Sequence, residues 1–201
     1  MHPFMRKLFH TQLGIESEHE ASRTILTKFG GCLHNPLFIG SGGEGFVYYC
    51  NGYIHKFVVN WDYPKRNIHK AYDNLCLLSE RIISPKYLYK FSVRKAGRNC
   101  LHLSYLAEPG QTFNYSTIET DWKQWLHCEL NNAMEEIFST GFFITDPSPS
   151  NFVIADNCLR FIDYGTDCIL IKEATFKLGK MHFIQKLKKK GIYLWKIGEN
   201  G

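Results

Sequence analysis

The dipeptide Asn51-Gly52 constrains the fold of this chain most, because it separates two runs rich in β-branched and aromatic residues. Between such runs it is the strongest short signal for a β-hairpin, since both turn residues must accept a positive φ. A two-residue turn also fixes the cross-strand pairs: Cys50 with Tyr53, Tyr49 with Ile54, and Val47 with Lys56. Side chains alternate between the faces of a strand, so one face of the hairpin is expected to carry Val47, Tyr49, Ile54 and Lys56.

A glycine-rich segment leads into this hairpin and completes the pattern G-x-G-x-x-G-x-V, which begins at Gly40. Glycines let backbone amides approach phosphate groups closely. As a dinucleotide-binding fingerprint the pattern fails, because a hairpin follows it where a long helix is required. An apolar lid over adenine and a lysine beside the phosphates are what a kinase-type pocket needs. The hairpin therefore predicts a nucleotide site made of Gly40, Ser41, Gly42, Gly43, Gly45, Val47, Ile54 and Lys56.

A second informative stretch reads ITDPSPSNFVIADNCLRFIDYG and ends at Gly165. Asp146 and Asn151 stand five positions apart across a loop with two prolines, and Asp163 opens a D-Y-G triplet. Phosphoryl transfer in kinases uses this spacing: one aspartate accepts the proton of the acceptor hydroxyl, and an asparagine and a second aspartate bind Mg²⁺. Asp146 is therefore the candidate catalytic base, and Asn151 and Asp163 are the candidate metal ligands.

The same stretch predicts a short hairpin. Strands are expected over Asn151–Ala155 and Leu159–Asp163, with Asp156-Asn157 as the turn. This hairpin would bring Asn151 and Asp163 to the same end.

Further elements follow from periodicity and from turn signals. Apolar residues at three- and four-residue steps predict helices over Tyr63–Ile83 and over Thr120–Thr140, the second ending at Gly141. The Trp122 to Phe138 stripe of the second helix is interpreted as core, and an earlier helix is expected over Glu18–Phe29, ended by Gly30-Gly31.

Two short strands are also expected, over Tyr87–Val93 and Cys100–Leu106. The strand end and linker from Ser104 to Gly110 are expected to meet the adenine edge through the backbone, with Ser104 and Leu106 as the contacts. The helix expected over Tyr63–Ile83 supplies two acids that could hold Lys56 in position. Asp73 lies at the better distance from Lys56, whereas Glu80 has the longer side chain, and Asp73 is slightly preferred.

Composition bounds the class of protein. The chain has 201 residues, 44% hydrophobic and 21% charged, which suits one globular unit or two small lobes. We expect a cytoplasmic location, because the sequence shows neither a secretory signal nor an apolar stretch of about 18 residues. The seven cysteines include no C-x-x-C pair, which favours reduced thiols over a zinc site.

The net charge of +5 is unevenly distributed, since eight lysines and one acid lie between Lys172 and Lys196. This tail predicts a basic amphipathic helix, which is expected to lie on an anionic membrane such as the inner membrane, to pack its apolar side on the larger lobe, or to do both. Nucleic-acid binding is disfavoured, because the lysines cluster in one tail and no aromatic stacking platform is predicted there.

The segment from about Phe38 to Gly165 resembles the protein-kinase-like superfamily. Within it, TDPSPSNFVIADNCLRFIDYGTD is most similar to the bacterial lipopolysaccharide core heptose kinases, which have a D-P-x-x-x-N-F loop, a short strand and an aspartate. The narrower likeness covers roughly Leu101 to Lys190 and includes the AMEEIF helix and the tail KMHFIQKLKKKG.

This resemblance implies an α+β, two-lobed minimal kinase-like fold with a small antiparallel-sheet N-lobe and a short, mostly helical C-lobe. Residues 1–35 are expected to form an N-terminal extension, 36–106 the N-lobe and 107–201 a truncated C-lobe. The cofactors implied are ATP and Mg²⁺, and the acceptor implied is the lipopolysaccharide core or another glycolipid.

Several departures from protein kinases bear on the acceptor. Ile144 and Thr145 replace the His and Arg of the catalytic loop, and Ser148 stands where Ser/Thr kinases have a lysine. No A-P-E follows Gly165, after which 36 residues remain. These departures disfavour a regulated protein kinase and favour a minimal kinase that acts on a small or glycolipid acceptor, although the glycine-rich loop is close to the protein-kinase pattern. A small protein Ser/Thr kinase and a nucleotide-binding pseudokinase or adaptor are therefore the alternatives.

Overall fold

The structure is a computed structural model of the 201-residue chain. It describes residues 3–31, 33–59, 67–83, 86–107, 120–144, 151–164 and 168–170, with Gln185 and Lys189. The chain divides into two compact units, and each is described by itself. The first unit comprises Met1–Ser79 and Lys90–Ala107, and the second comprises Glu80–Tyr89 and Glu108–Gly201. Helices and antiparallel sheets make up both, as the predicted α+β class requires.

A five-stranded antiparallel sheet forms the centre of the first unit, in the order β1-β2-β3-β5-β4. Its strands are β1 (Leu37–Ser41), β2 (Gly45–Cys50), β3 (Tyr53–Val59), β4 (Phe91–Gly97) and β5 (Cys100–Leu106). Asn51 and Gly52 have φ of 51° and 84°, so both turn residues are left-handed as predicted. All three predicted pairs of the hairpin are confirmed: Cys50 with Tyr53, Tyr49 with Ile54, and Val47 with Lys56.

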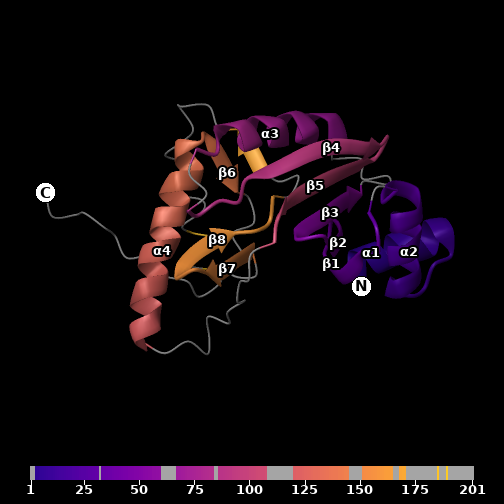
Figure 1. Cartoon of the computed structure of the whole chain (residues 1–201), viewed down its shortest axis with the longest axis horizontal. Helices are drawn as coiled ribbons and strands as arrows, with labels where there is room; N and C mark the ends of the chain where they lie inside the picture. The colour runs from indigo at the N-terminus through magenta and orange to yellow at the C-terminus, as the bar shows by residue number, and fades with distance from the viewer. Residues whose placement is uncertain are drawn as a thin grey trace, which may run out of the picture. The chain divides into compact units, whose positions relative to one another are not determined.

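Two N-terminal helices pack on one face of this sheet (Figure 1). They are α1 (Pro3–Leu13) and α2 (Glu18–Phe29), and α2 confirms the predicted helix. The Ser17 side chain accepts a hydrogen bond from the Glu20 amide at the start of α2, which satisfies one unpaired helical donor. Fully buried side chains from both helices and the hairpin share one core: Met5, Phe9, Ala21, Ile25, Phe46, Tyr48 and Phe57. Helices α1 and α2 thus contribute to the core of the first unit.

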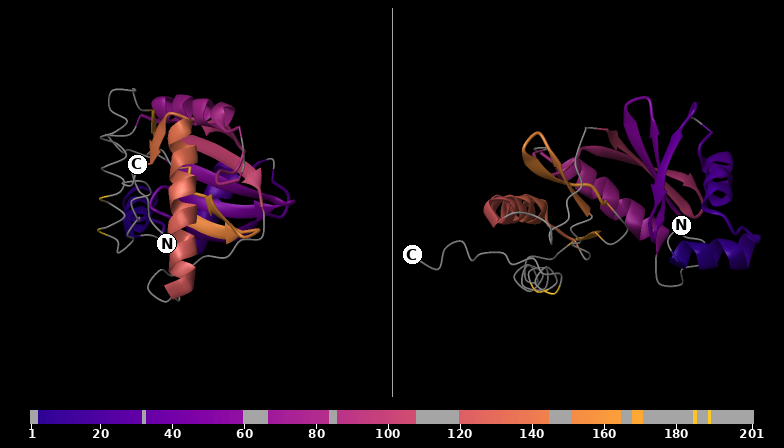
Figure 2. Two further views of the ribbon diagram at one scale, coloured as in Figure 1. Left: turned by 90° about the vertical axis from the view of Figure 1, so that its left-hand side faces the viewer. Right: turned by 90° about the horizontal axis from the view of Figure 1, so that it is seen from below.

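Helix α3 (Ile68–Arg81) lies over the opposite face of the sheet, and the views in Figure 2 separate it from α1 and α2. Its placement is marked by Lys95 of β4, whose ammonium lies 4.7 Å from the Tyr72 ring centroid and 3.1 Å from His69 Nδ1. The predicted helix is confirmed over 68–81, while residues 60–66 lie outside the described part. Its buried positions are Ile68, Ala71, Leu75 and Leu78.

The strand expected over Tyr87–Val93 begins later, at Phe91, and extends to Gly97. The reason is that residues 87–89 belong to the second unit and contact Phe161 and Tyr164 there instead of pairing with β5. The Phe161 amide donates to the Tyr87 carbonyl over 2.8 Å, and Leu88 forms a parallel bridge with Phe161. The strand predicted over Cys100–Leu106 is confirmed.

The second unit is built on α4 (Thr120–Ser139) and two short strand pairs. Strand β6 (Phe142–Ile144) pairs with β9 (Cys168–Leu170), and β7 (Phe152–Ala155) pairs with β8 (Cys158–Phe161). Helix α4 ends before Gly141, whose φ of 80° terminates it as predicted. Its buried apolar residues are Leu126, Leu130, Ala133, Met134, Ile137 and Phe138. Trp122 is 52% exposed, so the expected core stripe is wrong at its first turn.

In the described part of the chain, no helix is long and apolar enough to cross a membrane. Cys50, Cys76, Cys100, Cys128 and Cys158 are free thiols. The lysine-rich tail lies outside the described residues except for Gln185 and Lys189, which are helical and exposed.

Candidate functional site

The glycine-rich loop is a tight turn between β1 and β2. The Gly42 amide donates to the Gly45 carbonyl over 3.0 Å, and the Val59 amide donates to the Glu44 carbonyl over 2.9 Å. The Ser41 hydroxyl donates to the Glu18 carboxylate over 2.5 Å, which ties the loop to the first turn of α2. The predicted phosphate-binding loop is therefore held from both of its flanks.

The glycines of this loop are required by the fold to different degrees. A Cβ on Gly45 would lie 1.8 Å from the carbonyl oxygen of Phe57, so a side chain there cannot be accommodated without backbone movement. At Gly40 and Gly42 an added Cβ meets nothing within 4 Å, and neither residue has a positive φ. Packing within the described structure explains the glycine at 45, but it does not explain the glycines at 40 and 42.

Lys56 lies on the face of the hairpin that also carries Val47 and Ile54, as the register predicts. All three side chains are partly buried. The ammonium of Lys56 is 3.9 Å from Oε2 of Glu44, and the two side chains are 13% and 14% exposed. Glu44 was not predicted as a site residue. Its position inside the glycine-rich loop, which folds against the neighbouring strand, is the sequence signal that could have identified it.

The acid expected to hold Lys56 was Asp73, with Glu80 as the alternative. Asp73 is exposed on α3, and Glu80 is exposed and belongs to the second unit. The assignment of Asp73 stays a prediction, and Glu44 is the acid for which the structure gives a distance to Lys56.

The predicted adenine contacts, Ser104 and Leu106, differ in their backbone surroundings. Ser104 is flanked by His55 of β3 and Ser92 of β4, so it lies inside the sheet. Leu106 pairs with Tyr53 beyond the last partner from β4, and it is 51% exposed. Contact of either residue with adenine stays a prediction.

In the second unit, Asn151 and Asp163 are brought together by the β7–β8 hairpin. Asp156 and Asn157 have φ of 51° and 58°, the left-handed pair of a two-residue hairpin turn, which confirms the predicted turn. At the open end of the hairpin, the amide of Ile162 donates to the carbonyl of Asn151 over 2.9 Å. Asn151 and Asp163 are both partly buried and flank this hydrogen bond.

The residue after Asp163 anchors this end of the hairpin. Tyr164 is 1% exposed, and its hydroxyl donates to the Tyr89 carbonyl over 2.7 Å. Its ring packs edge-on against Phe161 with the centroids 5.6 Å apart. The central position of the D-Y-G triplet therefore fixes the backbone from which Asp163 projects.

An amide oxygen and a carboxylate are the oxygen ligands that Mg²⁺ accepts, and Mg²⁺ commonly completes its coordination with phosphates and water. Asn151 and Asp163 fit that requirement in number and type. Among the residues that the structure describes, no group of three or more His, Cys, Asp or Glu side chains converges as a metal site. The candidate base, Asp146, lies outside the described residues.

Comparison with known proteins adds no family assignment: no family model and no curated protein matches the chain. The kinase-like resemblance remains a prediction carried by the two motifs.

Proposed function

We propose that the chain is an ATP-dependent phosphotransferase with a two-lobed kinase-like fold, which transfers the γ-phosphate to a sugar hydroxyl of the lipopolysaccharide core. The observation that carries this proposal is the hairpin face bearing Val47, Ile54 and Lys56 beside a loop with two glycines that packing does not require. A ligand that contacts the loop backbone would explain why positions 40 and 42 carry no side chain. Phosphate oxygens held by backbone amides are such a ligand.

Each side chain then has a role in this proposal. Val47 and Ile54 cover the adenine, and Lys56 contacts the α and β phosphates. Asn151 and Asp163 hold Mg²⁺, which neutralises charge on the phosphates. Asp146 orients the acceptor hydroxyl and accepts its proton, a contribution of about 10²- to 10⁴-fold in rate.

Glu44 adds a step that the motifs alone did not suggest. Its carboxylate lies beside Lys56, in the loop proposed to hold the phosphates. ATP brings negative charge to the same ammonium, so nucleotide binding replaces or rearranges the Lys56–Glu44 pair. Glu44→Gln is therefore expected to strengthen ATP binding, whereas Lys56→Met weakens it.

The second candidate is a small protein Ser/Thr kinase, because the pattern G-x-G-x-x-G-x-V is followed by the hairpin and lysine typical of those enzymes. It differs from the first only in the acceptor. A nucleotide-binding pseudokinase would use the same hairpin face without transfer.

The nucleotide half of the proposal is tested at the loop glycines. Gly42→Ala is expected to leave the fold intact, since its Cβ meets nothing within 4 Å, and to weaken ATP binding roughly 10-fold through lost amide contacts. Gly31→Ala is the matched control, because a Cβ there also meets nothing and Gly31 lies outside the loop. Equal ATP affinity of the two variants, measured by calorimetry, would contradict the proposal.

The acceptor is tested by transfer of labelled γ-phosphate from Mg·ATP. Purified core lipopolysaccharide and a mixed protein extract serve as parallel acceptors, with Asp146→Asn as the blank. Label in the glycolipid supports the proposed function, and label in protein alone selects the second candidate. ATP binding without transfer to either acceptor would select the pseudokinase.

A further inference from the structure

The first unit contains a polar pocket on the face of its sheet opposite to Lys56. The pocket has a volume of about 370 Å³ and is lined by Leu33, Cys50, Asn51, Tyr53, His55, Ser92, Arg94, His102 and Ser104. Because side chains alternate along β3, Tyr53 and His55 project from one face and Lys56 from the other. The pocket is thus distinct from the proposed nucleotide face, and its volume lies at the lower end of small-molecule sites.

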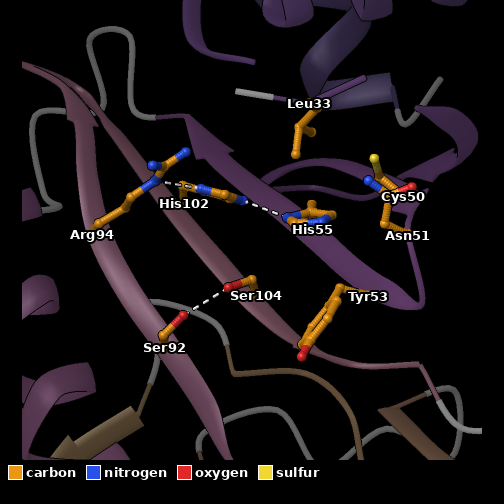
Figure 3. A pocket seen from close by; sticks show the side chains of 9 residues that line it. All are labelled: Leu33, Cys50, Asn51, Tyr53, His55, Ser92, Arg94, His102 and Ser104. Carbon is orange, nitrogen blue, oxygen red and sulfur yellow. Dashed lines mark hydrogen bonds between the residues drawn. The ribbon is translucent and has the colours of Figure 1, made fainter. Parts of the chain in front are cut away.

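A chain of hydrogen bonds orders the pocket, and Figure 3 shows its members in line. Arg94 Nε donates to His102 Nδ1 over 2.7 Å, and His102 Nε2 lies 2.8 Å from His55 Nδ1. An arginine can only donate, so a neutral His102 must accept at Nδ1 and donate from Nε2 to His55. His55 then carries its proton on Nε2 and is hydrogen bonded to the Cys50 backbone.

Packing holds this chain in place. His102 is 5% exposed and stacks on Phe57 with the ring centroids 4.5 Å apart. It also stacks against His55, at 5.1 Å. The guanidinium of Arg94 is therefore orientated by a buried imidazole, which reduces the entropy lost when a ligand binds to it.

Among the described lining residues, the pocket has a positive charge and no negative one. Arg94 brings a permanent positive charge, and none of the other described lining residues is acidic. The remaining polar groups are hydroxyls, an amide and imidazoles, and the Ser92 and Ser104 hydroxyls are 2.7 Å apart. Burial, and after it the charges of Arg94 and His55, lowers the pKa of His102 to about 3, so this imidazole adds no charge of its own near neutral pH.

We propose that this pocket binds a small hydroxylated oxyanion, a phosphate monoester or a carboxylate, with its anionic group on Arg94 and its hydroxyls toward Ser92, Ser104 and Tyr53. Guanidinium groups suit both kinds of anion through paired N–H donors. The site is independent of the proposed transfer of phosphate from ATP, because its side chains project from the other face of the sheet, and Ser104 is expected to meet adenine only through its backbone.

The test uses the full chain and follows the ring signals of His55 and His102 by NMR. The probes are glucose 6-phosphate and gluconate, with uncharged glucose as the reference. At least one anion is expected to shift both histidines saturably at about 1 mM or below, while glucose does not. The two anions distinguish a phosphate from a carboxylate ligand.

Arg94→Gln is expected to weaken binding roughly 10- to 100-fold. Lys95→Gln removes the same charge from the next residue on the opposite face of β4, so it is the matched control and should bind as the wild type does. Absence of saturable shifts, equal binding of glucose, or equal losses in the two variants would overturn the proposal.

A second variant keeps the test decisive if Arg94→Gln does not fold. Ser92 is exposed, so Ser92→Asp adds a carboxylate to the pocket with little demand on packing. It is expected to abolish anion binding by repulsion, and unchanged affinity would overturn the proposal. Lys56→Met should retain anion binding while losing ATP affinity, so failure of either site is recognised separately.

Discussion

His102 shows how a single buried residue links the sheet to pH. Burial comes first, followed by the charges of Arg94 and His55, in lowering the His102 pKa to about 3 from its ordinary 6.5. In the unfolded chain the imidazole takes up a proton below about pH 6.5, whereas the folded protein resists this until about pH 3. Its contribution to stability is therefore complete above the unfolded pKa and decreases as the pH falls through that window.

We expect the free energy of unfolding to fall by about 2 kcal/mol between pH 7 and pH 5 on account of His102. Urea unfolding followed by circular dichroism measures it. His102→Gln keeps an acceptor for Arg94 and a donor for His55 but does not titrate, so this decrease should be lost. His69→Gln removes an exposed imidazole of α3 and should keep it. Equal pH dependence of the wild type and His102→Gln would contradict the prediction.

Helix α1 provides a prediction about packing between elements. Phe9 is fully buried, and its ring meets Phe46 of β2 edge-on with the centroids 5.4 Å apart. Phe9→Ala is expected to cost about 3–5 kcal/mol of unfolding free energy through the cavity it leaves. Leu13→Ala, on the same helix but at a 41% exposed position, should cost less than about 1 kcal/mol. Similar small losses in both variants would show that α1 is a dispensable extension.

The hairpins were predictable because their turns are specified locally. Asn51-Gly52 and Asp156-Asn157 each supply two residues that tolerate a left-handed conformation, and the turn then sets the register of every later pair. Helix α2 was likewise predictable, because two glycines after Phe29 mark its end. Local chemistry was sufficient in these three elements.

Other features depend on contacts between distant segments and were missed. The sequence gives no local reason for Tyr87 to accept from Phe161, so the start of β4 was placed four residues too early. The pairing of β6 with β9 joins segments more than 20 residues apart, and it was not predicted. Glu44 was not predicted, because its proximity to Lys56 depends on how the loop folds against β3.

For the molecule as a whole, the proposed chemistry is divided between residues of the two units. Val47, Ile54 and Lys56 belong to the first unit, and Asn151 and Asp163 belong to the second. Nucleotide affinity and metal dependence are therefore expected to respond to different substitutions. Lys56→Met should lower ATP affinity at every Mg²⁺ concentration, because it removes the positive charge that contacts the α and β phosphates, and Mg²⁺ does not replace that charge.

Asp163→Asn should instead raise the Mg²⁺ concentration needed for half-maximal transfer. Loss of an outer-sphere partner alone costs about 10- to 100-fold in metal affinity, so loss of a direct ligand should cost at least as much. Asp156→Asn makes the same change at the turn of the same hairpin, where an exposed asparagine also tolerates positive φ, and it should leave the Mg²⁺ requirement unchanged. Transfer rates measured across a Mg²⁺ titration compare the two variants directly. If both behave alike, Asp163 is not a metal ligand, and the D-Y-G triplet has only the structural role that Tyr164 gives it.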